Sequence, residues 1–314
     1  MRDLRIVFMG TPEFAVATLD ALLKAKIKVV GVITAPDKPA GRGQKLSQSA
    51  VKKYALKNNL NVLQPINLKN KDFLTELQNL KANLQIVVAF RMLPKIVWQM
   101  PKYGTFNLHA SLLPEYRGAA PINWAIINGE TRTGVSTFFI DEKIDTGNVI
   151  LQKEVLIGEH ETLGELHDRL MKVGSRLVVQ TVQLIKEDKV VTFKQCEIEE
   201  KPAPKIYNET CRINWNTSLS NIYNFIRGLN PYPAAWTMLI NGATKLKLKI
   251  YDVKKESSNH NYNIGTIIAS KNEIKIAVTN GFIIIESLQL SGKRKMDSKS
   301  LLNGFAFQDQ AVVQ

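Results

Sequence analysis

An amide and an imidazole stand two residues apart in the stretch FNLHASLLPEYRGAAP, which covers residues 106–121. Asn107 and His109 close a short apolar run, and side chains alternate between the two faces of a strand. Both should therefore project from one face, while Phe106 and Leu108 point into packing on the other. For a lone histidine, a hydrogen-bonded core position is the plain alternative. Here an amide shares the face and a proline-containing loop follows, so we interpret Asn107 and His109 as a catalytic pair.

Two carboxylates are candidates for the partner of His109. Asp141 and Asp145 lie in FIDEKIDTGNV, residues 139–149, where an apolar run leads into a glycine-containing turn. Aspartate is common in such turns, and a turn-forming role is the simpler alternative. A carboxylate within a few ångströms of the imidazole would hold its tautomer and favour its charged form. The residues themselves do not choose between the two aspartates.

The surrounding pattern predicts an α/β domain with a mostly parallel, Rossmann-like sheet. Apolar β-branched runs alternate with amphipathic stretches, which is typical of strand–helix repeats with helices on both faces. In such sheets ligands bind beyond the carboxyl ends of the strands, where Asn107 and His109 fall. The predicted strands cover residues 4–10, 28–34, 61–63, 84–90, 105–109, 134–140 and 148–157, and the predicted helices cover 13–25, 49–59, 70–81 and 162–187.

A second, smaller domain is predicted near the C-terminus. The stretch KQCEIEEKPAPKIY is densely charged and holds two prolines, as linkers often do. A helix is expected over 218–228, and short strands without intervening helices then indicate a small β-barrel. These strands cover residues 235–240, 245–253, 264–269, 274–278 and 281–290. We expect a catalytic domain over 1–188, a linker over 189–206 and a barrel over 207–314.

The composition limits the class of protein. A chain of 314 residues with 45% hydrophobic and 22% charged residues is long enough for two domains with sizeable cores. No apolar run reaches the length of a membrane span, and the N-terminus lacks the layout of a secretory signal. Cys196 and Cys211 have no partner spacing for a disulfide framework or a metal site. We expect a cytoplasmic, monomeric protein without a metal.

The charge points to a polyanionic partner. The net charge is +14, and residues 205–314 hold 14 Lys and Arg against 7 Asp and Glu. Nucleic acid is the simplest partner for such a chain, and an acidic membrane surface is the alternative. A further basic segment, residues 34–55, carries Lys38, Arg42 and Lys45. We interpret it as a flexible arm that orders on phosphates, with a solvated loop as the alternative.

These pieces together resemble the 10-formyltetrahydrofolate-dependent formyltransferases. The resemblance is carried by FNLHASLLPEYRGAAPINWAI and DEKIDTG, and it implies Asn107, His109 and Asp145 as the catalytic residues. It also implies a folate-binding site without a metal. The residues expected to contact the folate are Ser111, Leu112, Leu113, Pro114, Phe90, Arg91 and Asp141.

From end to end the chain is similar to the family members that formylate methionyl initiator tRNA. FMGTPEFAV, PDKPAGRGQKL, IRGLNPYPAAWT and LSGKRKM carry this similarity. It implies that Lys38, Arg42 and Lys45 contact the acceptor end of the tRNA. It further implies that the C-terminal domain is a barrel of the oligonucleotide-binding (OB) type that binds this RNA, which agrees with its basic charge.

Two departures leave other functions to consider. Arg91 and Lys143 stand where members usually have glycine, beside the expected folate pocket, and we expect altered folate affinity without loss of the reaction. One alternative is a folate-dependent N-formyltransferase that acts on an amino-sugar nucleotide, which would not need the basic arm. The other is an RNA-binding protein on a retired catalytic scaffold, favoured by these two cations alone.

Overall fold

The chain divides into two compact units in the structure, a computed structural model that describes residues 1–40, 45–196 and 201–314. The first unit comprises Met1–Gly118, Gly134–Val155 and His167–Pro202, and the second comprises Ala119–Thr133, Leu156–Leu166 and Ala203–Gln314. The domain limits expected at residues 188 and 206 remain a prediction.

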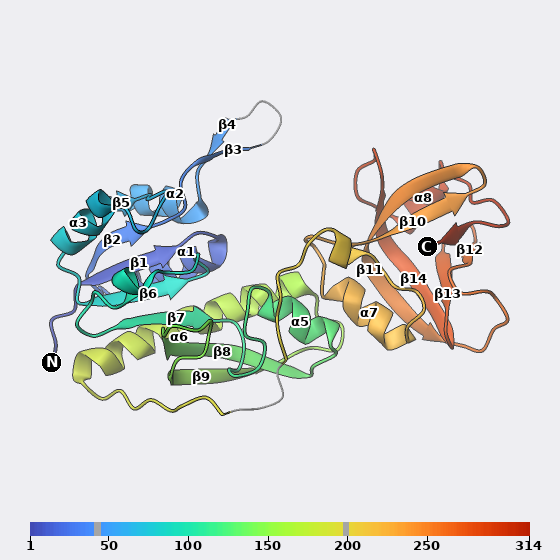
Figure 1. Cartoon of the computed structure of the whole chain (residues 1–314). Coiled ribbons are helices and arrows are strands. Elements are labelled where there is room, and N and C mark those ends of the chain that lie inside the picture. Colours follow the sequence, from blue (N-terminus) through green and yellow to red (C-terminus); the bar gives the residue numbers. More distant parts are fainter. Residues whose placement is uncertain (41–44, 197–200) are drawn as a thin grey trace. The chain divides into compact units, whose positions relative to one another are not determined.

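The first unit contains a mostly parallel sheet of seven strands, as predicted for a Rossmann-like domain (Figure 1). In sheet order the strands are β5 (Val62–Leu63), β2 (Val29–Ile33), β1 (Ile6–Gly10), β6 (Leu84–Val88), β7 (Thr105–His109), β8 (Arg132–Phe139) and β9 (Val149–Leu156). The pairs from β5 to β7 are parallel, and β8 runs antiparallel to β7. The strand order reverses at β1, between β2 and β6.

Helices cover both faces of this sheet. The helices are α1 (Glu13–Lys24), α2 (Ala50–Lys57), α3 (Lys71–Asn79), α4 (Lys95–Trp98) and α6 (Leu163–Glu187), the last of which begins in the second unit. On one face, α3 and α4 pack through Phe73, Leu77 and Val97 against apolar residues of β1 and β6. On the other, Gly174 of α6 lies against Leu108 of β7. Both faces are therefore buried, which explains the nearly continuous apolar strands.

The described part of the basic segment 34–55 contains a pair of short strands that the sequence pattern did not predict. It forms a short antiparallel hairpin, β3 (Lys38–Ala40) and β4 (Lys45–Ser47), followed by α2. The Ser49 side chain accepts a hydrogen bond from the Lys52 amide and so caps α2. The interpretation of this segment as a flexible arm that orders on phosphates remains a prediction.

The second unit is a nearly closed antiparallel barrel, as predicted. Its strands are β10 (Ala235–Asn241), β11 (Thr244–Ser257), β12 (Ile267–Ala269), β13 (Ile274–Val278), β14 (Gly281–Leu290), β15 (Met296–Asp297) and β16 (Val312–Val313). The edges of the sheet meet where the Val313 amide donates to the Gly265 carbonyl (2.9 Å) and the Ile267 amide donates to the Ala311 carbonyl (3.0 Å). The unit also holds α5 (Pro121–Ile127), a 3₁₀ turn (Glu209–Cys211), α7 (Leu219–Arg227) and α8 (Ser298–Leu302).

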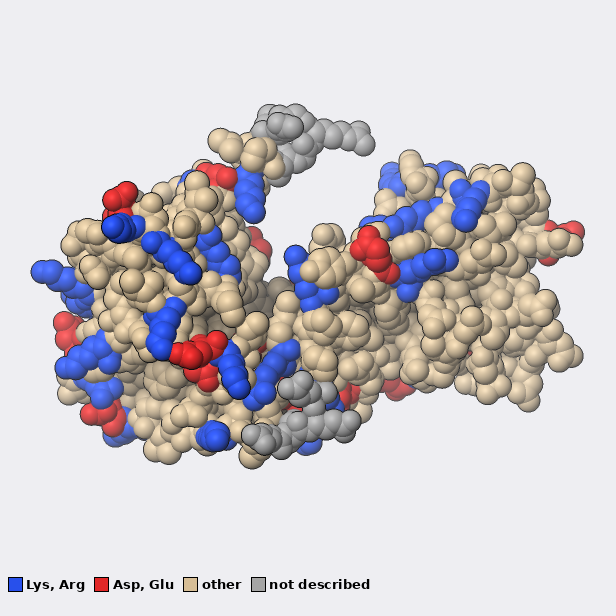
Figure 2. Space-filling model, viewed as in Figure 1, with Lys and Arg blue, Asp and Glu red and all other residues tan. Residues whose placement is uncertain are grey.

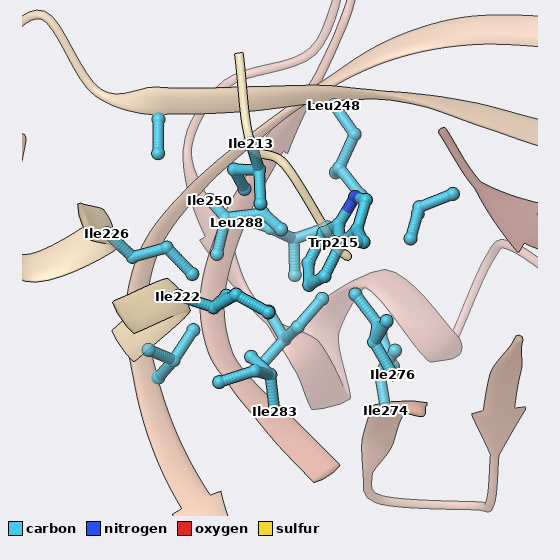
Figure 3. Packing of buried hydrophobic residues seen from close by; sticks show 14 of the residues in the cluster. Ile213, Trp215, Ile222, Ile226, Leu248, Ile250, Ile274, Ile276, Ile283 and Leu288 are labelled. Atoms are coloured by element: carbon cyan, nitrogen blue, oxygen red, sulfur yellow. The ribbon is translucent and has the colours of Figure 1, made fainter. Parts of the chain in front are cut away.

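The barrel core is built by strand alternation and by one face of α7. Leu248 and Ile250 of β11 point inward, where Ile222 and Ile226 of α7 meet them (Figure 3). Trp215 is buried in the same cluster. Its indole nitrogen donates to the Thr237 hydroxyl (2.9 Å), so its one polar atom is satisfied. One face of α7 therefore packs against the apolar core of the barrel.

No helix in the described ranges is both long and apolar enough to cross a membrane.

Removing a buried side chain of α7 tests this core. Ile222 is 1% exposed, so Ile222→Ala should lower the free energy of unfolding of the second unit by about 2–5 kcal/mol, through lost burial and a cavity. Denaturant unfolding followed by tryptophan fluorescence measures it. Ile264→Ala is the matched control, since Ile264 is 42% exposed and should change stability by less than about 0.5 kcal/mol. Equal effects of the two substitutions would contradict the assigned core.

Candidate active site

The strand β7 presents Asn107 and His109 on one face of the first unit's sheet. Phe106 and Leu108 point to the opposite face, toward α6, and are buried. Asn107 is half-buried and His109 is 6% exposed. The register pairs Asn107 with Val87 of β6, whose side chain lies in the cluster under α3 and α4. The two polar side chains thus leave the sheet on the side of α4.

The imidazole of His109 has an oxygen acceptor near each ring nitrogen. Its Nε2 lies 2.8 Å from the Tyr116 carbonyl and donates to it. Its Nδ1 lies 3.7 Å from Oδ2 of Asp145, longer than a hydrogen bond. Catalytic hydrogen bonds are often long without substrate and tighten in the reactive complex.

The loop between β8 and β9 delivers Asp145. Because β8 is antiparallel to β7, Phe139 lies opposite Phe106, at the edge of the sheet away from His109. The β8–β9 loop must therefore fold back toward the carboxyl end of β7 to bring Asp145 to the imidazole. Asp145 itself has a left-handed backbone conformation (φ 55°). Its Oδ2 accepts a hydrogen bond from the Gly118 amide (3.0 Å), which fixes the carboxylate on the side of His109.

The structure distinguishes the two candidate aspartates. The Asp141 carboxylate accepts hydrogen bonds from the Thr146 hydroxyl (2.8 and 3.0 Å) and the Lys143 amide (3.0 Å). It therefore closes a turn within its own loop, which is the simpler role considered for it. Asp145 is the aspartate beside the imidazole. The expected contact of Asp141 with folate remains a prediction.

The segment after β7 is held rigidly by hydrogen bonds. Ser111 is buried and its hydroxyl donates to the Glu115 carbonyl (2.6 Å). Ser136 of β8 donates to the Ser111 carbonyl (2.6 Å) and accepts from the Leu113 amide (3.1 Å). Gln152 of β9 donates to the Leu113 carbonyl (2.8 Å). Side chains of β8 and β9 therefore hold the backbone of this loop in place.

Some apolar residues expected to contact the folate pack against the protein itself. Leu113 is 4% exposed and packs with Phe138 and Val149. Leu112 lies against Gly134 of β8, where a Cβ would meet its side chain. Pro114 is half-buried. The expected folate contacts of these residues remain predictions, with the side chain of Leu113 the least accessible among them.

Phe90 and Arg91 follow β6 on the same side of the sheet. Phe90 is half-buried and packs on the apolar cluster beneath α3 and α4. The Arg91 guanidinium donates to the Pro65 carbonyl and, at 2.8 Å, to the Ile66 carbonyl. Arg91 therefore joins the loop after β6 to the loop after β5.

A polar contact also anchors the base of the β3–β4 hairpin. The Gln64 side chain donates to the Ala35 carbonyl and to the Asp37 carboxylate, both at 2.8 Å. Asp37 also pairs with Lys52 of α2 at 2.6 Å. Hydrogen bonds from Gln64 and then Lys52 hold the pKa of the Asp37 carboxyl below its ordinary value.

Of the three residues expected to bind tRNA, only Lys38 has a described side chain. Lys38 is exposed in β3. Lys45 begins β4, but its side chain is not among those described, and Arg42 lies outside the described residues. Their contact with RNA remains a prediction.

Sequence reasoning missed two side chains at this site, Arg117 and Gln195. Both hydrogen-bond to the loop that carries Asp145. Arg117 lies inside the quoted motif, next to the glycine that binds Asp145, and its position was the one available signal. Gln195 stands in a stretch that was interpreted as linker, and nothing in its sequence neighbourhood marks it.

Within the described ranges, no group of three or more His, Cys, Asp and Glu is arranged to hold a metal ion. The expectation of a metal-free reaction remains a prediction.

Comparison with known proteins gives consistent matches along the chain. Residues 4–182 match the family model described as formyl transferase, and residues 205–306 match the model of the formyl transferase C-terminal domain. The methionyl-tRNA formyltransferase of Flavobacterium johnsoniae is 59% identical over 314 residues and the match covers both chains fully. That of Parabacteroides distasonis is 54% identical over 311 residues, 96% of each chain.

A solved structure shows the same fold. The N-formyltransferase from Helicobacter canadensis, in complex with folinic acid and dTDP-3-aminofucose, has a TM-score of 0.64 and is 23% identical; the match covers 93% of this chain and all of that one. One family model covers more than half of this chain, and full-length relatives share more than half of its residues. The chain therefore belongs to the formyl transferase family.

Proposed function

We propose that the chain transfers the formyl group of 10-formyltetrahydrofolate to the amino group of methionyl initiator tRNA, for translation initiation. The observation that carries this proposal is the Asp145 carboxylate 3.7 Å from the imidazole of His109, with Asn107 on the same face of β7 as that imidazole. Relatives named methionyl-tRNA formyltransferase match the whole chain at up to 59% identity. The folinic acid held by the solved N-formyltransferase supports a folate-derived donor.

The residues support acyl transfer to an amine. The amine attacks the formyl carbon, the carbonyl oxygen gains negative charge, the bond from that carbon to N10 breaks, and the proton lost by the amine goes to N10. The amide of Asn107 is a donor for the developing oxyanion. The N–H on Nε2 of His109 becomes a second donor when it turns from the Tyr116 carbonyl, which it contacts in the structure, to the substrate. Asp145 orients the imidazole and accepts or relays the proton, directly or through water. Every group in this account belongs to the first unit.

The acceptor is argued from charge as well as from the relatives. Lys245, Lys247 and Lys249 alternate along β11 with the inward leucines, so they share the outer face of the barrel. Lys247 also lies over the ring of Trp236, 3.9 Å from its centroid. Figure 2 shows Lys and Arg gathered on this part of the second unit, where Figure 1 draws β10 and β11. Cations beside an aromatic ring suit RNA phosphates and bases.

An amino-sugar nucleotide is the acceptor to exclude. The solved relative with dTDP-3-aminofucose shares the fold at 23% identity. That likeness concerns the fold alone and does not indicate that this chain accepts the same substrate. Formylation assays with methionyl-tRNA and with amino-sugar nucleotides decide between the two. Transfer to the sugar nucleotide alone would overturn the proposal.

Removal of either oxyanion donor tests the mechanism. His109→Ala and Asn107→Ala should each lower kcat about 100- to 1,000-fold, because a preorganised donor is lost. Formylation of methionyl-tRNA under saturating folate measures the rate. His167→Ala is the matched control, since His167 is half-exposed on α6 and stacks edge-on against Phe14; it should keep wild-type kcat. Wild-type rates in both site variants would refute the assignment.

A second prediction separates the two substrates. Arg42→Ala should raise KM for charged initiator tRNA and leave KM for the folate nearly unchanged, because the arginine is expected to contact only the RNA. Lys57→Ala, at the exposed end of α2, is the charge-matched control and should change neither constant. An equal loss of folate affinity in Arg42→Ala would contradict the assignment.

Salt dependence tests the barrel face. RNA affinity should fall as a power of the salt concentration, with a slope near 0.7–0.9 per phosphate contact. The double substitution Lys245→Ala and Lys249→Ala should flatten that slope by about one contact for each lysine lost. Fluorescence anisotropy with labelled tRNA measures it, with Lys271→Ala as an exposed control. An unchanged slope in the double variant would show that this face does not bind the RNA.

A further inference from the structure

The buried amide of Gln195 uses both of its ends at the loop that carries Asp145. Gln195 is 8% exposed. Its Nε2 donates to the Asp145 carbonyl (2.9 Å) and to the Gly147 carbonyl (2.8 Å). Its Oε1 accepts from Nη2 (2.7 Å) and Nε (3.1 Å) of Arg117. One side chain thus joins the β8–β9 loop to the loop after β7.

Arg117 completes the attachment. Its Nε also lies 3.1 Å from the Asp145 carbonyl, to which it donates. The next residue, Gly118, donates its amide to Oδ2 of Asp145 (3.0 Å). Arg117 and Gln195 therefore hold the carbonyl of Asp145, and the Gly118 amide holds its carboxylate. Neither Arg117 nor Gln195 touches the imidazole or the carboxylate of the catalytic pair in any described contact.

The backbone of Asp145 needs this support. A residue other than glycine at a φ of 55° is strained, and such a conformation persists only where its surroundings enforce it. The adjoining loop end is equally constrained, because a Cβ on Gly147 would lie 1.7 Å from the Phe139 carbonyl oxygen. The loop is thus pinned at Gly147 by close packing and at Asp145 by hydrogen bonds.

The segment that carries Gln195 also supports His109. Phe193 pairs with Val149 of β9 through two backbone hydrogen bonds (2.9 and 3.0 Å), which sets the position of Gln195 two residues later. Further along, the Lys201 carbonyl accepts from the Tyr116 amide (2.8 Å), and the Tyr116 carbonyl accepts from His109 Nε2 (2.8 Å). Residues expected to be only a linker therefore brace both members of the catalytic pair.

We propose that Gln195, acting with Arg117, is a positioning residue that holds the Asp145 carboxylate against His109. This inference rests on the proposed function, and it assigns the pair no contact with either substrate. A role in stability alone is the competing explanation, since any buried amide satisfies neighbouring polar groups. The two explanations differ in kinetics, because a positioning residue acts only through Asp145.

A double-mutant cycle tests the proposal. Gln195→Ala should lower kcat about 100-fold, the cost of a displacement of about 1 Å at a reacting group, with KM for folate and for tRNA within twofold of wild type. In an Asp145→Ala background the same substitution should change kcat by less than twofold, because the group that it positions is gone. An equal loss in both backgrounds, or wild-type kcat in Gln195→Ala, overturns the proposal.

Two further variants protect the test against misfolding. Gln195→Glu keeps the shape but loses both donors to the loop, so it should reproduce the loss of kcat. Arg117→Lys keeps the charge but not the two-sided geometry of the guanidinium, and its effect should also vanish with Asp145→Ala. Gln183→Ala, an exposed glutamine of α6 bonded to Glu187, is the matched control and should keep wild-type kcat.

Failure of the inference can be told apart from failure of the function. If wild type formylates methionyl-tRNA and Gln195→Glu and Arg117→Lys are as fast, only the positioning role is refuted. If wild type does not formylate methionyl-tRNA, the proposed function itself is refuted. Thermal melting of every variant completes the comparison, and a loss of kcat that follows the loss of folded protein counts against positioning.

Discussion

The site depends on the placement of one carboxylate beside one imidazole. His109 is fixed by β7, with the Tyr116 carbonyl on one ring nitrogen and Asp145 facing the other. The position of the imidazole follows directly from the strand, because His109 is the last residue of β7. The carboxylate is harder to place, since it comes from a loop that starts at the opposite edge of the sheet. Much of the structure around the site serves to hold this loop in place.

Most of the fold follows from local sequence pattern. The buried strands β1, β2, β6 and β7 are short apolar runs between helical stretches, and each forms where the pattern predicts it. The long-range closures do not follow from pattern. The strand β16 has two residues, and its pairing depends on Gly265, nearly fifty residues away in the chain. The hairpin β3–β4 was missed because its residues, rich in Pro, Gly and Lys, resemble a loop.

The candidate site was only partly predictable. Asn107 and His109 are found by alternation along one strand, since their spacing alone puts them on one face. Residue types and spacing do not separate Asp141 from Asp145, and only the family resemblance points to Asp145. In the structure the Thr146 hydroxyl and the Gly118 amide, each brought in by the fold, distinguish them. Gln195 has no sequence signal at all. Its role arises because Phe193 adds to the edge of β9, a pairing between segments that are far apart in the chain.

The contacts of Arg91 connect the loop after β6 to the base of the β3–β4 hairpin. Its guanidinium donates hydrogen bonds to the carbonyls of Pro65 and Ile66. The residue just before them, Gln64, donates to the Asp37 carboxylate at the base of the hairpin. An unbroken run of bonds thus leads from the end of β6 to the foot of the basic hairpin. A displacement of the hairpin base would therefore be opposed by the same hydrogen bonds that hold the loop after β6.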